Sequence, residues 1–116
     1  MIYIIDDDEI MAECIARYCG EKKIRIFSNA IEAMQCLDYD DFPEIIFLDI
    51  LLDGPDGFTF LNELASYNDT AKIPIIIVSS LNLAGQDLSI YGVVGIINKD
   101  NMTPKEIKQY VDQYTA

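Results

Sequence analysis

The side chains best suited to chemistry in this sequence come directly after four apolar runs. Each run is rich in isoleucine, and each is followed by a carboxylate, a hydroxyl or an ammonium group. The runs and the residues after them are 1–5 before Asp6, Asp7 and Asp8, 45–48 before Asp49, 75–78 before Ser79, and 95–98 before Lys99. Crowded carboxylates can hold a hard divalent cation, because such ions prefer oxygen ligands. With a cation bound, Asp49 could attack a phosphoryl group, while Lys99 and Ser79 contact its oxygens.

Carboxylates that crowd together repel one another. At ~5 Å and an effective dielectric of ~20, each pair costs about 3 kcal/mol. A bound Mg²⁺ relieves this cost, and it typically takes one or two carboxylates plus waters. The alternative is a solvated acidic turn that caps the next helix, where negative charge is favoured. We assign the capping role to Asp8 and the metal-binding role to Asp6, Asp7 and Asp49, whereas Ser79 alone could equally be a helix cap.

The apolar runs lack the alternation of a half-exposed strand, which indicates strands buried on both faces. Amphipathic spacing predicts helices between them, with starts marked by Asn29 and Glu32 and by Thr103 and Pro104. A helix near residues 84–91 has weaker support, because Gly85 lies within a short span. Five strands alternating with five helices predict an α/β fold, a three-layer sandwich around a five-stranded parallel sheet.

Composition narrows the classes of function. The 116 residues suit one domain, and 51% of them are hydrophobic. The net charge of −12 argues against nucleic-acid binding, which needs clustered lysine and arginine. We find no membrane-length apolar run and no signal peptide, so we expect a cytoplasmic protein. The three cysteines lack metal-binding spacing and predict buried free thiols, and the lack of histidine removes Ser-His and Cys-His catalysis.

With these residues in place, the sequence resembles the receiver domain of two-component response regulators, the CheY-like fold. The resemblance includes Asp6-Asp7, Asp49, Ser79 and Lys99, and it covers the whole chain, residues 1–116, in order and spacing. Further matching motifs lie at residues 28–33, 49–57 and 92–99. The resemblance implies the flavodoxin-like strand order 2-1-3-4-5, which would place the ends of the first and third strands side by side.

The resemblance also implies a specific chemistry. Asp49 would accept a phosphoryl group from the phosphohistidine of a histidine kinase or phosphotransfer protein. Asp7 and Asp49 would bind Mg²⁺ directly, the backbone carbonyl of Leu51 would be a third ligand, and Asp6 would act mainly through water. The chain would catalyse only its own phosphorylation and dephosphorylation, so it would be a regulator and not an enzyme acting on other substrates.

Ser79 and Lys99 would grip the phosphoryl group and draw the following loops into an active arrangement. The conformational switch would control a downstream protein or output domain, and a phosphorylation-dependent homodimer is a further option. The face around residues 84–91, the fifth strand and the last helix would contact the partner, with Tyr91, Ile96 and Tyr110 as apolar candidates. The last helix ends without a linker, which slightly favours a stand-alone regulator.

Three departures from the family pattern keep alternatives open. Asp53 and Asp100 stand where the family usually has proline, and Ile96 stands where it usually has an aromatic switch residue. These departures leave open a receiver that is not phosphorylated and serves as an interaction module. The pattern Asp6-x-Asp8 loosely resembles haloacid-dehalogenase-like phosphatases, which normally need a longer chain. A flavodoxin-like protein that binds FMN would share the fold, but the loop after its first strand must bind phosphate. The three aspartates at that point in this sequence would repel phosphate.

Overall fold

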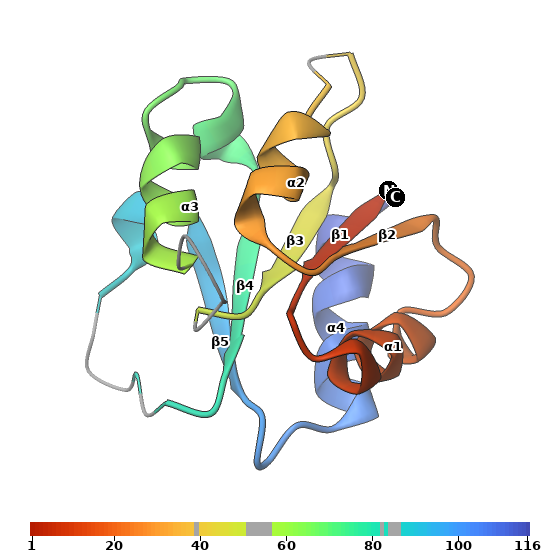
Figure 1. Cartoon of the computed structure of the whole chain (residues 1–116). Coiled ribbons are helices and arrows are strands. Elements are labelled where there is room, and N and C mark those ends of the chain that lie inside the picture. The colour runs from red at the N-terminus through yellow and green to blue at the C-terminus, as the bar shows by residue number, and fades with distance from the viewer. Residues whose placement is uncertain (39, 51–56, 82, 84–86) are drawn as a thin grey trace.

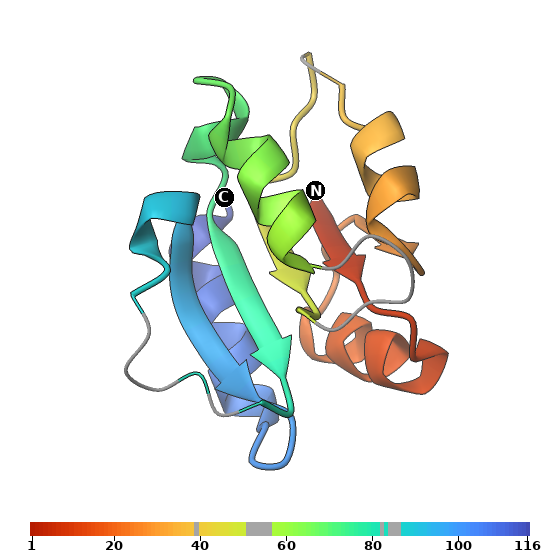
Figure 2. The same ribbon diagram turned by 60° about the vertical axis from the view of Figure 1, so that its left-hand side comes forward.

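The computed structural model describes residues 1–38, 40–50, 57–81, 83 and 87–116. Its five strands form one parallel sheet in the order β2-β1-β3-β4-β5, which confirms the predicted fold class and strand order. The strands are β1 (Ile2–Ile5), β2 (Ile24–Phe27), β3 (Ile45–Leu48), β4 (Ile75–Ser79) and β5 (Val93–Asn98). In Figure 2 the arrowheads of β1, β3, β4 and β5 point toward the same, lower end of the sheet.

Four α-helices and two short 3₁₀ turns connect the strands in the described residues. They are α1 (Glu9–Tyr18), α2 (Ala30–Gln35), α3 (Gly57–Ala65), η1 (Thr70–Lys72), η2 (Ser89–Tyr91) and α4 (Pro104–Tyr114). The helix starts follow the predicted caps, since the side chains of Asn29 and Thr103 accept hydrogen bonds from the N–H groups of Glu32 and Glu106. None of the helices described is long and apolar enough to cross a membrane.

The sheet lies between two layers of helices, and each layer closes its own apolar core (Figure 1). On one face, α2 and α3 pack over strand residues such as Tyr3, Ile46 and Ile77. On the other face, α1 and α4 pack over residues such as Ile4 and Phe47. Strands β1, β3 and β4 are buried at every position, because both of their faces are covered. The site residues therefore extend from a rigid support.

The described part of the segment between β4 and β5 differs from the expected fourth helix. Where residues 84–91 were expected to be helical, the described residues 87–91 contain only the single turn η2, and residues 84–86 lie outside the description. Asp87 accepts hydrogen bonds from the N–H and hydroxyl of Ser89, and Gly92 at φ 82° ends the turn in the left-handed region. Leu88 still packs into the core, so the apolar spacing marked burial correctly but not helix length.

The cysteines depart in part from their predicted burial. All three are free thiols, but only Cys19 is buried, while Cys14 and Cys36 are partly exposed. Cys14 lies on α1 beside the fully buried stripe of Ala12 and Ile15, so its side chain sits at the border of the core. Burial raises the pKa of Cys19 to about 12, which makes it the least reactive thiol of the three.

Candidate functional site

The sheet topology places Asp6 and Asp49 next to each other. Asp6 follows β1 and Asp49 follows β3, and the two strands are neighbours with Ile5 paired to Leu48. The N–H of Asp49 donates to the carbonyl of Ile5 at 2.8 Å, which continues the ladder by one residue. The N–H of Asp6 donates to the carbonyl of Phe27 on β2 at 3.0 Å. Both carboxylates are thus fixed by backbone pairing at the carboxyl edge of the sheet.

Asp7 completes a cluster of three carboxylates. One carboxylate oxygen from each of Asp6, Asp7 and Asp49 lies within 4.8 Å of the others. The burial is unequal, since Asp6 is 2% exposed and Asp49 is 5% exposed, whereas Asp7 is open to solvent. Asp8 turns away to cap α1, where its side chain accepts hydrogen bonds from the N–H groups of Ile10 and Met11. The expected capping role of Asp8 is confirmed, whereas metal binding by the other three aspartates stays a prediction.

Lys99 carries the positive charge of the site. Its Nζ lies 3.0 Å from Asp49 Oδ2 and 3.1 Å from Asp6 Oδ2, and its side chain is only 16% exposed. Burial acts to lower the pKa of Lys99, but the hydrogen bond to Asp49 and the charges of the Asp6 and Asp49 carboxylates outweigh it, so the pKa lies above its usual value. Lys99 therefore stays protonated at neutral pH and bridges the two buried carboxylates.

One carboxylate oxygen of the cluster is poorly satisfied. Asp6 Oδ1 accepts a hydrogen bond from the N–H of Asp8 at 2.9 Å, but the buried Oδ2 has only its ion-pair contact with Lys99 and no hydrogen bond in the described residues. Burial raises the pKa of Asp6, and the partners on Asp8 and Lys99 offset this only in part. The convergence of one oxygen from each of three carboxylates matches the all-oxygen ligand set that Mg²⁺ prefers.

Ser79 reaches the same edge from β4 without touching the carboxylates through any described hydrogen bond. It is 1% exposed, and its hydroxyl oxygen accepts a hydrogen bond from the N–H of Leu81 at 3.1 Å. Its carbonyl accepts the N–H of Lys99 at 3.0 Å, so Ser79 and Lys99 are held side by side. The remaining predicted ligand, the Leu51 carbonyl, lies outside the described residues.

Gly57 ties the start of α3 to the strand that carries Asp49. Its N–H donates to the carbonyl of Ile50 at 3.0 Å. A Cβ at Gly57 would lie 2.6 Å from Ile50 Cα and 2.9 Å from the carbonyl oxygen of Asp49, so only glycine allows this approach. Gly57, the last residue of the Gly-Pro-Asp-Gly motif in the sequence, is thus required on steric grounds close to the site.

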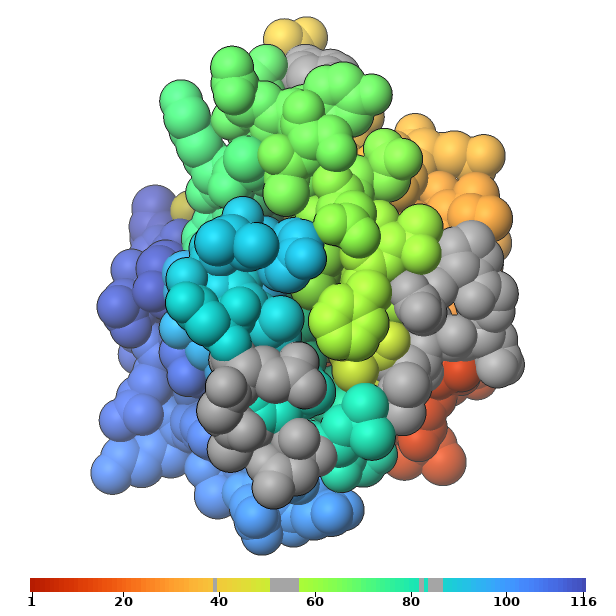
Figure 3. Space-filling view, turned by 90° about the vertical axis from the view of Figure 1, so that its left-hand side faces the viewer, coloured from red at the N-terminus to blue at the C-terminus, as the bar shows by residue number. Residues whose placement is uncertain are grey.

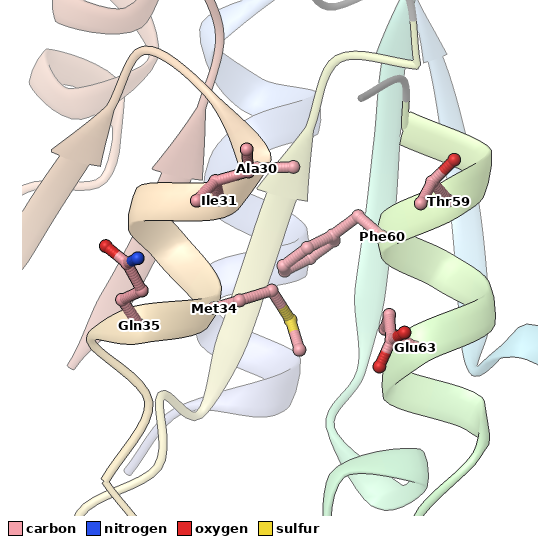
Figure 4. A pocket seen from close by; sticks show the side chains of 7 residues that line it. All are labelled: Ala30, Ile31, Met34, Gln35, Thr59, Phe60 and Glu63. Atoms are coloured by element: carbon pink, nitrogen blue, oxygen red, sulfur yellow. The ribbon is translucent and has the colours of Figure 1, made fainter. Parts of the chain in front are cut away.

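A separate apolar groove lies between α2 and α3 and was not predicted from the sequence. It has a volume of about 300 Å³, and Met34 and Phe60 point into it from the two helices (Figure 4). Ile31, which is 50% exposed, lies on its wall, and Glu63 adds a carboxylate. Helical spacing indicates which residues face inward, but it does not show where two helices leave a gap between them.

Comparisons with known proteins identify the family. The response regulator receiver domain family matches residues 2–112. A protein-glutamate methylesterase/protein-glutamine glutaminase of Geobacter metallireducens is 25% identical over 112 residues, which cover 90% of this chain and 31% of that protein. A probable transcriptional regulator, ycf29, of Porphyra purpurea is 24% identical over 110 residues, which cover 91% of this chain and 52% of that protein. The chain thus spans between about a third and a half of these relatives' lengths.

Solved structures agree on the fold. The receiver domain of NtrX from Brucella abortus superposes with a TM-score of 0.82 at 21% identity, covering 98% of this chain and 97% of that one. The receiver domain of a sensor histidine kinase from Pseudomonas aeruginosa, with a magnesium ion in its active site cleft, gives 0.78 at 18% identity, with 97% and 94% covered. With its family match over nearly the whole sequence and its CheY-like sheet, the chain belongs to the response regulator receiver domain family.

Proposed function

We propose that this chain accepts a phosphoryl group on Asp49 from the phosphohistidine of a histidine kinase or a phosphotransfer protein. The observation that carries the proposal is the contact of Lys99 Nζ with Asp49 Oδ2 at 3.0 Å, beside two further carboxylates. A phosphoryl group on Asp49 would lie close to the Lys99 ammonium and to the carboxylates of Asp6 and Asp7. This combination suits a transfer that depends on charge neutralisation and positioning.

In the transfer step, an Asp49 carboxylate oxygen forms a bond to phosphorus as the phosphorus–nitrogen bond of the donor breaks. The electron pair of that bond stays on the imidazole, which leaves as a neutral base because its other ring nitrogen already carries a proton in the donor. Lys99 then exchanges part of its contact with Asp49 for a phosphoryl oxygen, since the Asp49 oxygens of the acyl phosphate carry less charge than the carboxylate did. The Ser79 hydroxyl, at the end of the neighbouring strand β4, would donate its proton to another phosphoryl oxygen while its oxygen still accepts from the N–H of Leu81.

Asp6, Asp7 and Asp49 are the described residues that would hold Mg²⁺. The partly satisfied Oδ2 of Asp6 and the exposed carboxylate of Asp7 both have acceptor capacity to spare. A bound divalent cation would supply positive charge against the incoming phosphoryl oxygens. The chain's own residues orient the nucleophile, because backbone pairing to Ile5 and the contact with Lys99 hold Asp49 from two directions.

The surface formed by η2 and β5 is the proposed contact face for a downstream protein, an output domain or a second copy of the chain. Ile90 is 75% exposed, Val94 is 43% exposed and Ile96 is 36% exposed, whereas Tyr91 and Tyr110 are half-buried. Figure 3 shows residues 87–91 on the surface between α3 and α4. Ile96 is one of the three residues expected from the sequence, and Ile90 and Val94 add exposed apolar surface to this face.

A second candidate function is an interaction module that works without phosphorylation. It is favoured by Ile96, which occupies the predicted switch position as an exposed aliphatic side chain with no ring to rotate. In that case the acidic cluster would bind a cation without any phosphoryl transfer to Asp49, and the η2–β5 surface would bind its partner constitutively. Residues 1–116 form a single receiver domain in either proposal, whether alone or within a longer protein.

Incubation with acetyl phosphate separates the two candidates. We expect a gain of one phosphoryl group by intact-mass measurement, with magnesium required, and no gain for Asp49→Asn. Asp8→Asn is the matched control, because it makes the same chemical change in the acidic run while retaining a good helix cap. A wild-type protein that gains no mass with either acetyl phosphate or a phosphorylated histidine donor would support the module instead.

A further inference from the structure

Lys99 lies at the start of a turn that follows β5. The N–H of Lys99 donates to the carbonyl of Ser79 at 3.0 Å, which extends the pairing of β5 with β4 by one residue. Beyond Lys99 the chain leaves the sheet and passes to the cap of α4 at Thr103. The backbone that follows Lys99 is therefore not held by the sheet, and other contacts must fix it if the Lys99 side chain is to point toward Asp49.

Asn98 supplies those contacts from the preceding position. Its Oδ1 accepts a hydrogen bond from the N–H of Asp100 at 2.8 Å, and its carbonyl accepts one from the N–H of Asn101 at 3.1 Å. Lys99 is the middle residue of the ring that the Asn98 side chain closes, an arrangement called an Asx turn. Asn98 is itself paired with Ser79 in the sheet, so the turn is anchored to a rigid strand.

The residue at position 100 makes this arrangement possible. Asp100 has the N–H group that Asn98 needs, whereas a proline, as in the family pattern, has none. Asp100 is exposed, so its carboxylate is not required to fill the site. A side-chain hydrogen bond in this chain thus restricts the backbone after Lys99, and a proline at position 100 would remove that bond.

We propose that Asn98 is a positioning residue for Lys99, and that its hydrogen bond to the Asp100 N–H holds the Lys99 ammonium against Asp49 and Asp6. The importance of this role for phosphoryl transfer rests on the proposed function. The ion pair itself exists in the unphosphorylated protein and can be measured without any transfer.

Four variants test the turn from both ends. Asn98→Ala removes the acceptor, and Asn98→Ser restores a shorter hydroxyl acceptor that can close a similar turn. Asp100→Pro removes the donor, and Asp100→Asn keeps the N–H while removing the charge. Each protein is compared by thermal unfolding, by the ¹⁵N resonance of the Lys99 ammonium, and by the maximal rate of phosphorylation at saturating acetyl phosphate.

We expect Asn98→Ala and Asp100→Pro to broaden or shift the Lys99 ammonium resonance and to lower the maximal rate by about three- to tenfold. Asn98→Ser should recover part of both effects, and Asp100→Asn should match the wild type. Combining Asn98→Ala with Asp100→Pro should add nothing to the Asp100→Pro effect, because one hydrogen bond is lost in either case.

A lower melting temperature with an unchanged Lys99 resonance in Asn98→Ala would overturn the positioning role and leave Asn98 a structural turn residue. Additive effects in the double variant would overturn it as well. If no variant and not even the wild type is phosphorylated, the proposed function fails, while the Lys99 resonance still decides whether Asn98 positions the ion pair.

Discussion

Replacing Lys99 with methionine removes the ammonium group that touches both buried carboxylates while keeping a flexible side chain of similar length. At a separation of 3.0 Å, opposite unit charges attract by roughly 5 kcal/mol at an effective dielectric of about 20. Lys99 makes two such contacts, but its own burial offsets much of the gain. We expect a net loss of about 3 kcal/mol in unfolding free energy without magnesium, or a melting temperature lower by about 10 °C.

The same substitution should have the opposite effect on magnesium binding. Lys99 competes for Asp49 Oδ2 and Asp6 Oδ2, and its charge repels a cation. We therefore expect Lys99→Met to bind Mg²⁺ at least about tenfold more tightly, a difference of roughly 1.4 kcal/mol, and magnesium should restore most of the lost stability.

Thermal unfolding in a chelator and in saturating magnesium, together with a calorimetric titration, measures both effects. Lys105→Met is the matched control, since it removes the same charge from an exposed position on α4. The electrostatic reasoning is refuted if Lys99→Met has the melting temperature of the wild type in the chelator, or if its magnesium affinity is unchanged. Equal changes in Lys99→Met and Lys105→Met would refute it as well.

Three further predictions concern single side chains. Asp7→Asn should weaken Mg²⁺ binding at least about tenfold by titration, because it removes one of the three clustered carboxylates. Cys19 should resist a thiol reagent at about pH 8, because its pKa of about 12 leaves almost no thiolate at pH 8. Cys14 and Cys36 should react, because both are partly exposed. The phosphorylated state should last many minutes or longer, and Leu81→Glu should shorten it, because a carboxylate two residues after Ser79 can orient a water where leucine cannot.

Each of these has a contrary result. Unchanged magnesium affinity in Asp7→Asn would remove Asp7 from the cluster's function. Modification of Cys19 at the rate of Cys14 would show that the thiol is not shielded. Loss of the phosphoryl group within seconds in the wild type, or an unaltered lifetime in Leu81→Glu, would remove Leu81 from the path of the attacking water.

The sequence predicted the sheet well because its signal there is local. Isoleucine-rich runs without alternation marked β1, β3 and β4 as buried strands, and the caps at Asn29 and Thr103 marked the starts of α2 and α4. Strand ends in a parallel sheet meet at one edge, so the convergence of Asp6 with Asp49 also followed from position in the chain.

Features that depend on tertiary packing could not be predicted in this way. The spacing of Leu88 and Tyr91 indicated burial equally well for a helix and for the single turn η2. The register shift between Ile75 and Ile76, which pairs Ile75 with Val93 and Ile76 with Gly95, has no local signature. The double contact of Lys99 depends on side-chain directions from three strand ends, which position in the sequence does not specify.

Mapping the phosphorylated side chain tests the central claim most directly. The protein is treated with acetyl phosphate and magnesium, reduced with borohydride to convert an acyl phosphate into an alcohol, digested and sequenced by tandem mass spectrometry. We predict that homoserine replaces aspartate at position 49 and at no other position, and that the signal is lost without magnesium. Homoserine at Asp6 or Asp7, or none at position 49 in a protein that has gained a phosphoryl group, would contradict Asp49 as the acceptor.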